Sequence, residues 1–418
     1  MYLSHTRASD RRTAGADARR EAPGRSVSAL PPTVLALGTV SLLTDASAEM
    51  VTAVLPMYLV YGLGIGFLQL GALDGLYTGA TALLRLGGGY AADRLRRPKA
   101  VATAGYGLSA LTKLALPAVG STLAGMGALV AADRAGKGLR TAPRDALITH
   151  AAPEKDLGRA FGAHRAMDTC GALLGPLLAF AVLYAVPGGY DTAFLVSFCL
   201  AAAGVVILVS FVDGGTAARA GERLRGFRDG LVPLRSPEVR RCLLATAVLG
   251  VFTVGDMSLF VGLQRRLEAP VEALPLLPLA TALVFMAAAA PVGRLADRVG
   301  RRRMFVLGHA FAACAYLFVL LAPFKGWPAV AVSLVLHGLF YAATDGVLMA
   351  YVAPYIAEAA RTTGLAAVQS VQAVCRAFGA VAFGGLAAWG GLAPAFAVFA
   401  TGLIAATAGI ALHLRRSP

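Results

Sequence analysis

Long apolar runs separated by short polar segments fill most of the 418-residue chain. Each run has about 20 residues or more, enough for an α-helix to cross a hydrocarbon layer of roughly 30 Å. The pattern predicts about 12 spans, at residues 31–62, 68–92, 99–119, 121–148, 158–185, 191–212, 240–264, 272–296, 304–323, 328–356, 362–388 and 393–413. The expected fold class is an all-α integral membrane protein.

The polar segments divide the runs into two sets of six. Residues 1–30 are rich in arginine and lack an apolar core, so they predict a disordered cytoplasmic tail and not a cleaved signal peptide. Residues 31–212 form the first six-helix bundle and residues 239–418 the second. The segment 213–238, with five arginines before Glu238, is expected to be a basic cytoplasmic linker between them.

Composition excludes a soluble protein. Hydrophobic residues make up 57% of the chain and charged residues 15%, and the mean hydropathy is +0.67. The net charge of +15 comes from Lys and Arg in short segments between the runs, which indicates the positive-inside rule and no nucleic-acid partner. An even number of spans then places both termini in the cytoplasm and the chain in the cell membrane. Arg265 and Arg266 are exceptions near an outer end, where a water-filled cavity is one explanation.

The chain lacks the motifs of the common enzyme classes. There is no HExxH, GxSxG or Walker A pattern, which argues against a membrane enzyme and against a primary pump. The five cysteines form no CxxC pair, so neither a disulfide framework nor a metal site is expected. We predict no cofactor.

One loop pattern occurs twice, 204 residues apart. It follows the second span, at Gly89–Arg97, and the eighth, at Gly293–Arg302. Both copies resemble motif A of the major facilitator superfamily, G-x-x-x-D-R-x-G-R-R, although Arg96 replaces a glycine in the first. The resemblance implies two pseudo-symmetric six-helix bundles with the substrate site between them. It also implies that motif A controls the conformational state, through Gly89, Asp93, Arg94, Arg97, Gly293, Asp297, Arg298, Gly300 and Arg301. Loss of Asp93 should shift the balance between outward-open and inward-open forms.

Two more stretches resemble motifs of this family. Arg134 and Gly138 fit motif B, for which a role in proton coupling is proposed in the family. Gly171, Gly175 and Pro176 fit motif C, a helix-packing motif associated with antiporters. Residues of the first, fourth and fifth spans also resemble a poorly characterised bacterial and archaeal branch, described mainly as permeases or efflux proteins.

Acidic side chains inside a bilayer need a reason, because each costs about 2.5–3.5 kcal/mol at mid-helix. Asp45 and Glu49 share one face of the first span at spacing i, i+4. Two nearby carboxylates cannot both ionise cheaply, so one is expected to hold a proton near neutral pH, as a proton carrier requires. The alternative is a structural ion pair that fixes the first span.

Further candidates for substrate or proton binding lie on other spans: Arg134, His164, Arg165, Asp168, Asp256, Asp345 and Arg376. We expect His164 or Arg165 either to pair with Asp45 or Glu49 or to form gate contacts at the cytoplasmic end of the fifth span. Asp345 and Arg376 are expected to form an interhelical pair. His337 is expected to be a hydrogen-bonded core residue more often than a proton relay.

Two other bases have predictions of their own. Lys113 is expected to extend to the membrane interface; the alternative is that it counters a carboxylate or binds an anionic substrate. Lys137 is expected to neutralise Asp133 one turn away.

The combined prediction is a secondary transporter of a small organic molecule that works by alternating access. Proton-coupled efflux is the leading hypothesis, with the proton as coupling ion and the protein as a monomer. A proton-coupled uptake symporter uses the same parts. A non-transporting membrane sensor is a further alternative, which the short tail disfavours.

Overall fold

The computed structural model describes residues 30–95, 97–120, 122–153, 156–212, 236–356 and 361–416. Helices fill nearly all of these ranges, and no strand occurs within them. In chain order they are α1 (Pro32–Met57), α2 (Phe67–Leu95), α3 (Pro98–Val119), α4 (Leu123–Ala151), α5 (Leu157–Ala185), α6 (Tyr190–Phe211), α8 (Pro237–Val251), α9 (Asp256–Leu267), α10 (Leu276–Val299), α11 (Arg301–Leu321), α12 (Trp327–Val352), α13 (Arg361–Gly390) and α14 (Leu392–Arg416).

The helices correspond to 12 spans, because α8 and α9 together form one segment, Pro237–Leu267. Nine spans in the described ranges are long and apolar enough to cross a membrane; α2, α3 and α4 are not among them. Charged residues inside α4, such as Asp133, Arg134 and Lys137, lower its hydropathy. The predicted all-α membrane fold is confirmed.

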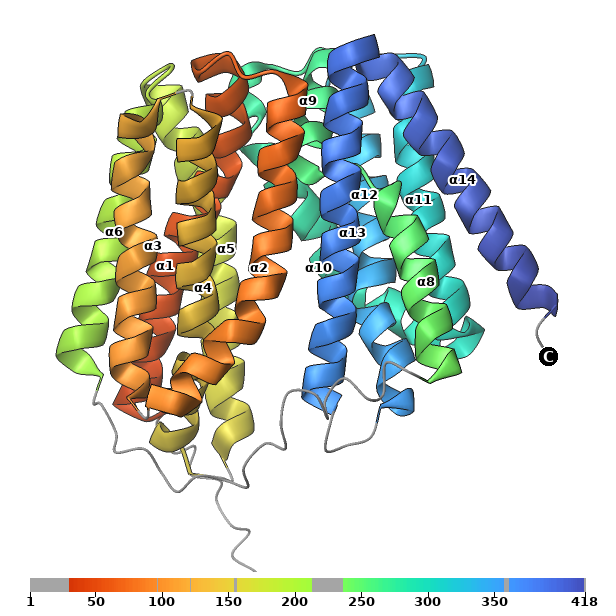
Figure 1. Cartoon of the computed structure of the whole chain (residues 1–418). Helices are drawn as coiled ribbons and strands as arrows, with labels where there is room; N and C mark the ends of the chain where they lie inside the picture. The colour runs from red at the N-terminus through yellow and green to blue at the C-terminus, as the bar shows by residue number, and fades with distance from the viewer. Residues whose placement is uncertain are drawn as a thin grey trace, which may run out of the picture.

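The two sets of six spans lie side by side (Figure 1). Helices α1–α6 form one half and α8–α14 the other, and α2 faces α13 between them. We name the ends of the bundle by their loops. The basic end carries the turns at Arg97 and at Gly300–Arg303, and the neutral end carries the turns at residues 63–66 and 186–189. Residues 1–29 and 213–235 lie outside the described residues, so the predicted tail and linker remain predictions.

The halves pack tightly at the neutral end. A side chain on Gly75 of α2 would stand 2.7 Å from the Ala377 carbonyl oxygen of α13, and one on Gly71 would overlap the backbone of Ala380. Gly384 of α13 in turn faces the backbone of Phe67. These glycines permit backbone-to-backbone contact, as small residues do in membrane helix pairs. The α2–α13 contact therefore closes the neutral end.

The seventh span is not the continuous helix predicted for residues 240–264. It breaks after Val251, and α9 restarts at Asp256. Tyr316 satisfies one freed backbone group, because its hydroxyl accepts from the Val254 N–H at 3.0 Å. Gly379 of α13 has no side chain to obstruct the break, where a Cβ would lie 2.7–2.9 Å from three carbonyl oxygens. A break at membrane depth is tolerated when protein groups satisfy its backbone in this way.

Candidate functional site

A cavity of about 260 Å³ lies between the two halves. One half contributes Glu49, Thr52 and Pro56 of α1. The other contributes Asp256, Met257 and Phe260 of α9, Pro278, Thr281, Ala282 and Phe285 of α10, and Tyr341 and Asp345 of α12. Three carboxylates thus face an otherwise largely apolar wall, and no lysine or arginine lines the cavity within the described residues.

Asp256 has more hydrogen-bond and ion-pair partners than the other two carboxylates. The Tyr341 hydroxyl donates to it at 2.6 Å, His337 Nε2 lies 3.3 Å away, and Arg376 approaches to 3.8 Å. Arg376 also donates to the Tyr341 hydroxyl at 2.6 Å. His337 is fully buried. Asp256 is therefore held in place by α12 and α13 while its carboxylate still reaches the cavity.

Asp345 and Glu49 are less constrained. Asp345 is exposed, lines the cavity, and makes no hydrogen bond or ion pair within the described ranges. Glu49 lies 3.9 Å from Lys137 of α4, and both side chains are 30% exposed. These two carboxylates are available to a molecule that enters the cavity.

A second charged cluster fills the space between α1, α4 and α5. Arg140 donates to Asp45 at 3.4 Å, and Arg144 lies 3.7 Å from Asp168 and 3.0 Å from Asp145. The carboxyl groups of Asp45 and Asp168 face each other. The acidic neighbour of Asp45 is thus Asp168, on another helix, as well as Glu49 one turn away.

The remaining candidates of α5 lie beside this cluster. His164 is buried, and its Nε2 lies 2.8 Å from the Ser41 hydroxyl. Arg165 is 77% exposed and contacts Asp168 at 3.4 Å. The expected pairing of His164 or Arg165 with Asp45 or Glu49 is therefore wrong. The side chains of α4 reach those acids first.

The motif B arginine belongs to a third network, in the core of the first half. Arg134 is buried, pairs with its neighbour Asp133, and lies 4.0 Å from the centre of the Tyr77 ring. Lys113 of α3 contacts the same carboxylate at 3.1 Å. Two buried cations therefore share one carboxylate.

This network corrects two predictions from the sequence. Lys113 does not extend to the interface but is 2% exposed and bound to Asp133. Lys137 does not neutralise Asp133 but lies next to Glu49. The predicted Asp345–Arg376 ion pair is also wrong, since Arg376 contacts Asp256 and Tyr341 instead.

The motif C residues bring α5 against α1. A side chain on Gly175 would stand 2.6 Å from the Ala46 carbonyl oxygen and 2.8 Å from Glu49 Cβ, and one on Gly171 would overlap the backbone of Leu42. Pro176 follows inside α5. The close approach places Asp168 next to Asp45.

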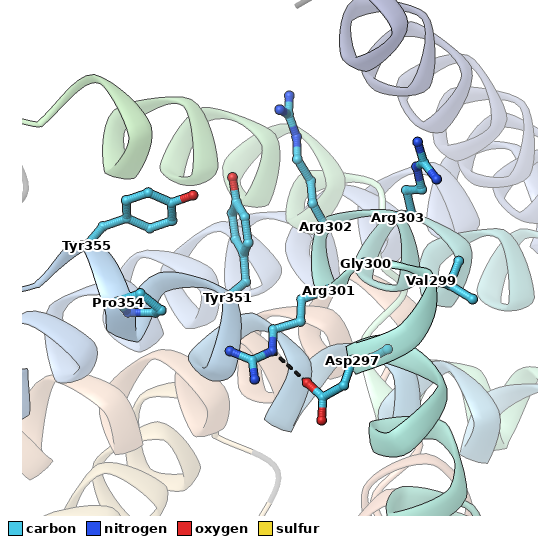
Figure 2. Close-up of a pocket in the computed structure, with 10 residues that line it drawn as sticks. Asp297, Val299, Gly300, Arg301, Arg302, Arg303, Tyr351, Pro354 and Tyr355 are labelled. Atoms are coloured by element: carbon cyan, nitrogen blue, oxygen red, sulfur yellow. Dashed lines mark hydrogen bonds and ion pairs between the residues drawn. The ribbon is translucent and has the colours of Figure 1, made fainter. Parts of the chain in front are cut away.

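Motif A of the second half stays within that half (Figure 2). Arg301 Nε donates to Asp297 at 2.8 Å, and Arg301 Nη1 donates to the Ala350 carbonyl at 2.7 Å. Gly300 has a φ of 106°, which allows the turn between α10 and α11. Tyr351 and Tyr355 line the same open depression. Arg298 and Gly293 lie on the last turns of α10, where a Cβ on Gly293 would meet open space.

Motif A of the first half is described in part. Gly89, Asp93 and Arg94 lie in the last turns of α2, but their side chains are outside the described residues. Arg97 precedes α3 and is exposed.

Three groups at these sites are not among the residues predicted from the sequence to bind substrate or protons. Asp74 of α2 is 3% exposed and accepts from the Met257 backbone N–H of α9, in the other half. Tyr341 joins Asp256 to Arg376. Arg140 contacts Asp45, and Arg144 contacts Asp168. An acid eight residues into an apolar helix was the available signal for Asp74.

Two half-bundles of membrane-spanning helices around a central cavity with carboxylates in its wall define a polytopic transporter. The family model of the Major Facilitator Superfamily matches residues 37–289 and 257–418. The chain belongs to the major facilitator superfamily.

Relatives and solved structures agree with this assignment. The chain is 30% identical over 343 residues to the uncharacterized MFS-type transporter MJ1317 of Methanocaldococcus jannaschii, covering 80% of this chain and 83% of the relative. It is 36% identical over 160 residues to the uncharacterized protein Rv2265 of Mycobacterium tuberculosis, covering 38% and 39%.

Solved structures match over nearly the whole chain. The nucleoside transporter NupG superposes with a TM-score of 0.79 at 13% identity, over 92% of this chain and 100% of that one. The peptide transporter POT, solved as a single-site mutant, gives 0.72 at 14%, over 92% and 95%. A bacterial homologue of the human lysosomal transporter Spinster, inward-facing and unoccupied, gives 0.69 at 15%, over 90% and 95%. At these identities the likeness shows the fold alone.

Proposed function

We propose that this transporter exports small organic cations from the cell in exchange for protons. The observation that carries the proposal is the cavity between the halves, with Glu49, Asp256 and Asp345 in its wall and no base lining it within the described residues. A positively charged amine on an apolar body fits such a wall. The carboxylates provide charge-assisted hydrogen bonds, and Phe260 and Phe285 provide apolar contact.

The proton site in this proposal is the pair formed by Asp45 and Asp168. One of two facing carboxyl groups keeps a proton more readily than an isolated carboxyl does, because two negative charges repel strongly at close range. Arg140 contacts Asp45 and Arg144 contacts Asp168, so uptake of a proton changes which ion pairs hold α1, α4 and α5 together. The two conformations then bind the proton with different affinities, as the coupling of proton movement to transport requires.

The close α1–α5 contact supports export. Gly171 and Gly175 belong to the stretch that resembles the antiporter motif, and they press α5 against α1 beside Asp45 and Glu49. The proton pair and the cavity therefore share α1, which carries Asp45 toward one and Glu49 toward the other.

The orientation and location belong to the same proposal. Arg97, Lys99 and Arg301–Arg303 cluster at one end, and the positive-inside rule assigns that end to the cytoplasm. Both termini then lie in the cytoplasm, and the chain is a multi-pass protein of the cell membrane. We expect a monomer.

The test uses purified protein in proteoliposomes with ethidium as the cationic probe and fluorescein as its anionic counterpart. An acidic interior should drive ethidium inward as protons leave, and fluorescein should not accumulate. Asp345→Asn should raise the apparent KM for ethidium about tenfold, equivalent to about 1.4 kcal/mol of binding free energy. Accumulation that requires an acidic exterior would identify a symporter, and accumulation of fluorescein alone would contradict the cation assignment.

The proton site needs a separate readout. Asp45→Asn and Asp168→Asn should abolish gradient-driven accumulation of ethidium but keep exchange of labelled for unlabelled ethidium at equal pH. Exchange needs the cavity and the conformational change but no net proton movement. Gradient-driven accumulation at the parental rate in both variants would contradict the assignment of this pair.

A further inference from the structure

Asp74 makes a contact that belongs neither to the cavity nor to the Asp45–Asp168 pair. It lies eight residues into α2, in the first half, and is 3% exposed. Its Oδ2 accepts from the backbone N–H of Met257 at 3.0 Å, and it also bonds the backbone N–H of Ser258. Both donors belong to the first turn of α9, in the second half. No lysine or arginine pairs with Asp74 within the described residues.

The first turn of α9 needs this partner. The leading N–H groups of a helix have no acceptor inside the helix, and together they form a site of partial positive charge. Met257 and Ser258 are 4% and 0% exposed, and an unsatisfied buried N–H is costly. Gly255, the residue before α9, makes no side-chain cap hydrogen bond. The carboxylate of another helix does so instead.

Gly255 makes the approach of Asp74 possible. A side chain at residue 255 would overlap the Asp74 carboxylate and would also stand 2.8 Å from Ala380 Cβ of α13. The cap therefore depends on one residue from each half, Asp74 and Gly255.

The same end of the molecule holds further polar and ring contacts between the halves. Tyr61 donates to Gln264 of α9, and Arg265 lies 5.1 Å from the centre of the Phe67 ring and 5.5 Å from that of Tyr61. The α2–α13 glycine contact lies alongside. Asp74 is the most buried of the polar side chains in this set.

The capped turn also begins with Asp256, a cavity residue. The charged groups that face Asp74 are Asp256 and Arg376, and Asp256 is held by His337, Tyr341 and Arg376. The first turn of α9 thus lies between the contact of the two halves and the cavity. Asp74 bonds the backbone of this turn from the first half, and Asp256, the first residue of the turn, faces the cavity.

We propose that Asp74 is a positioning residue that latches the neutral end shut by capping α9 across the two halves. A ligand that engages Asp256 acts on the capped turn, and loss of the cap releases α2 from α9 so that the neutral end opens. The latch does not depend on which molecule or ion the transporter carries, so it stands or falls separately from the proposed function.

The experiment measures distances at both ends of the molecule by pulsed electron paramagnetic resonance. Spin labels are attached in a cysteine-free protein in nanodiscs. Val186→Cys and Trp389→Cys report the neutral end, and Thr149→Cys and Val299→Cys report the basic end; all four sites are exposed. Asp74→Ala should lengthen the neutral-end distance and shorten the basic-end distance in most molecules. Asp74→Asn should give a smaller shift, because its amide oxygen still caps the helix.

Two controls separate a latch from general loosening. Asp191→Ala removes another acid at the neutral end, on the first turn of α6, and should leave both distances unchanged. Gly255→Ala should reproduce the Asp74→Ala shift from the other half, and it carries the test where Asp74→Ala does not fold. Broadening at both ends without opposite shifts would overturn the proposal, as would parental distances in folded Asp74→Asn and Gly255→Ala protein.

Discussion

Asp133 is the carboxylate on which two buried cations depend. Lys113 and Arg134 both contact it, and Ser109 donates to it at 2.6 Å. Removal of one partner from a buried ion pair costs more than the pair itself contributes, because the remaining charge stays buried without compensation. The three residues should therefore respond unequally to substitution.

We expect Asp133→Ala to lower the free energy of unfolding by about 3–5 kcal/mol, since it leaves two uncompensated cations. Lys113→Met removes one cation and leaves Asp133 paired with Arg134, so its effect should be clearly smaller. Denaturant titration in mixed micelles measures both values. Equal losses for the two substitutions would mean that Asp133 does not serve both bases.

At this scale the sequence identifies which residues are unusual but not which residues they contact. Asp45, Asp256 and Arg376 are conspicuous in apolar runs. Their partners depend on how each helix is rotated and on how far a long side chain reaches across to the next one. Lys113 illustrates the difficulty, because a lone base in an apolar run is compatible both with the interface and with an acid on a neighbouring helix.

At the scale of helices, span positions follow closely from hydropathy, and the start of α2 at Phe67 and the end of α5 at Ala185 are within one residue of prediction. The break before Asp256 was missed because the apolar run continues through it. Its causes lie on other helices, in Asp74, Tyr316 and Gly379, so a local reading of the seventh span could not find them.

Contact between α1 and α5 depends on two glycines at closest approach. We predict that Gly171→Ala reduces thermal stability and transport, because the added methyl overlaps the backbone of Leu42. Gly162→Ala is the matched control on the same helix, where a Cβ meets nothing within 4 Å. Without a clash, alanine favours the helix by up to about 1 kcal/mol. Detergent-solubilised protein and a fluorescence melting assay compare the two, and equal melting temperatures would show that α1 and α5 tolerate a wider separation.

For the whole molecule, the contacts between the halves are distributed unequally along the bundle. Tyr61, Asp74 and the α2–α13 glycines join the halves at the neutral end. At the basic end, the described motif A contacts of Asp297 and Arg301 remain inside one half. A sequence repeat predicts two similar halves but not which end they close, because the repeat is the same in every state of the transport cycle.

This asymmetry predicts from which side the cavity is reached. Ala282→Cys, in the cavity wall of α10, should react with a membrane-impermeant maleimide in inverted membrane vesicles and much more slowly in intact cells. In the proposed orientation the neutral end faces outward, so its closure should block the reagent in cells, whereas the basic end should admit it in vesicles. Trp389→Cys, 89% exposed at the neutral end, is the control and should react in intact cells. Faster labelling of Ala282→Cys in cells than in vesicles, with Trp389→Cys accessible in cells, would mean that the resting transporter opens at its neutral end. Labelling of Trp389→Cys in vesicles alone would instead reverse the proposed orientation.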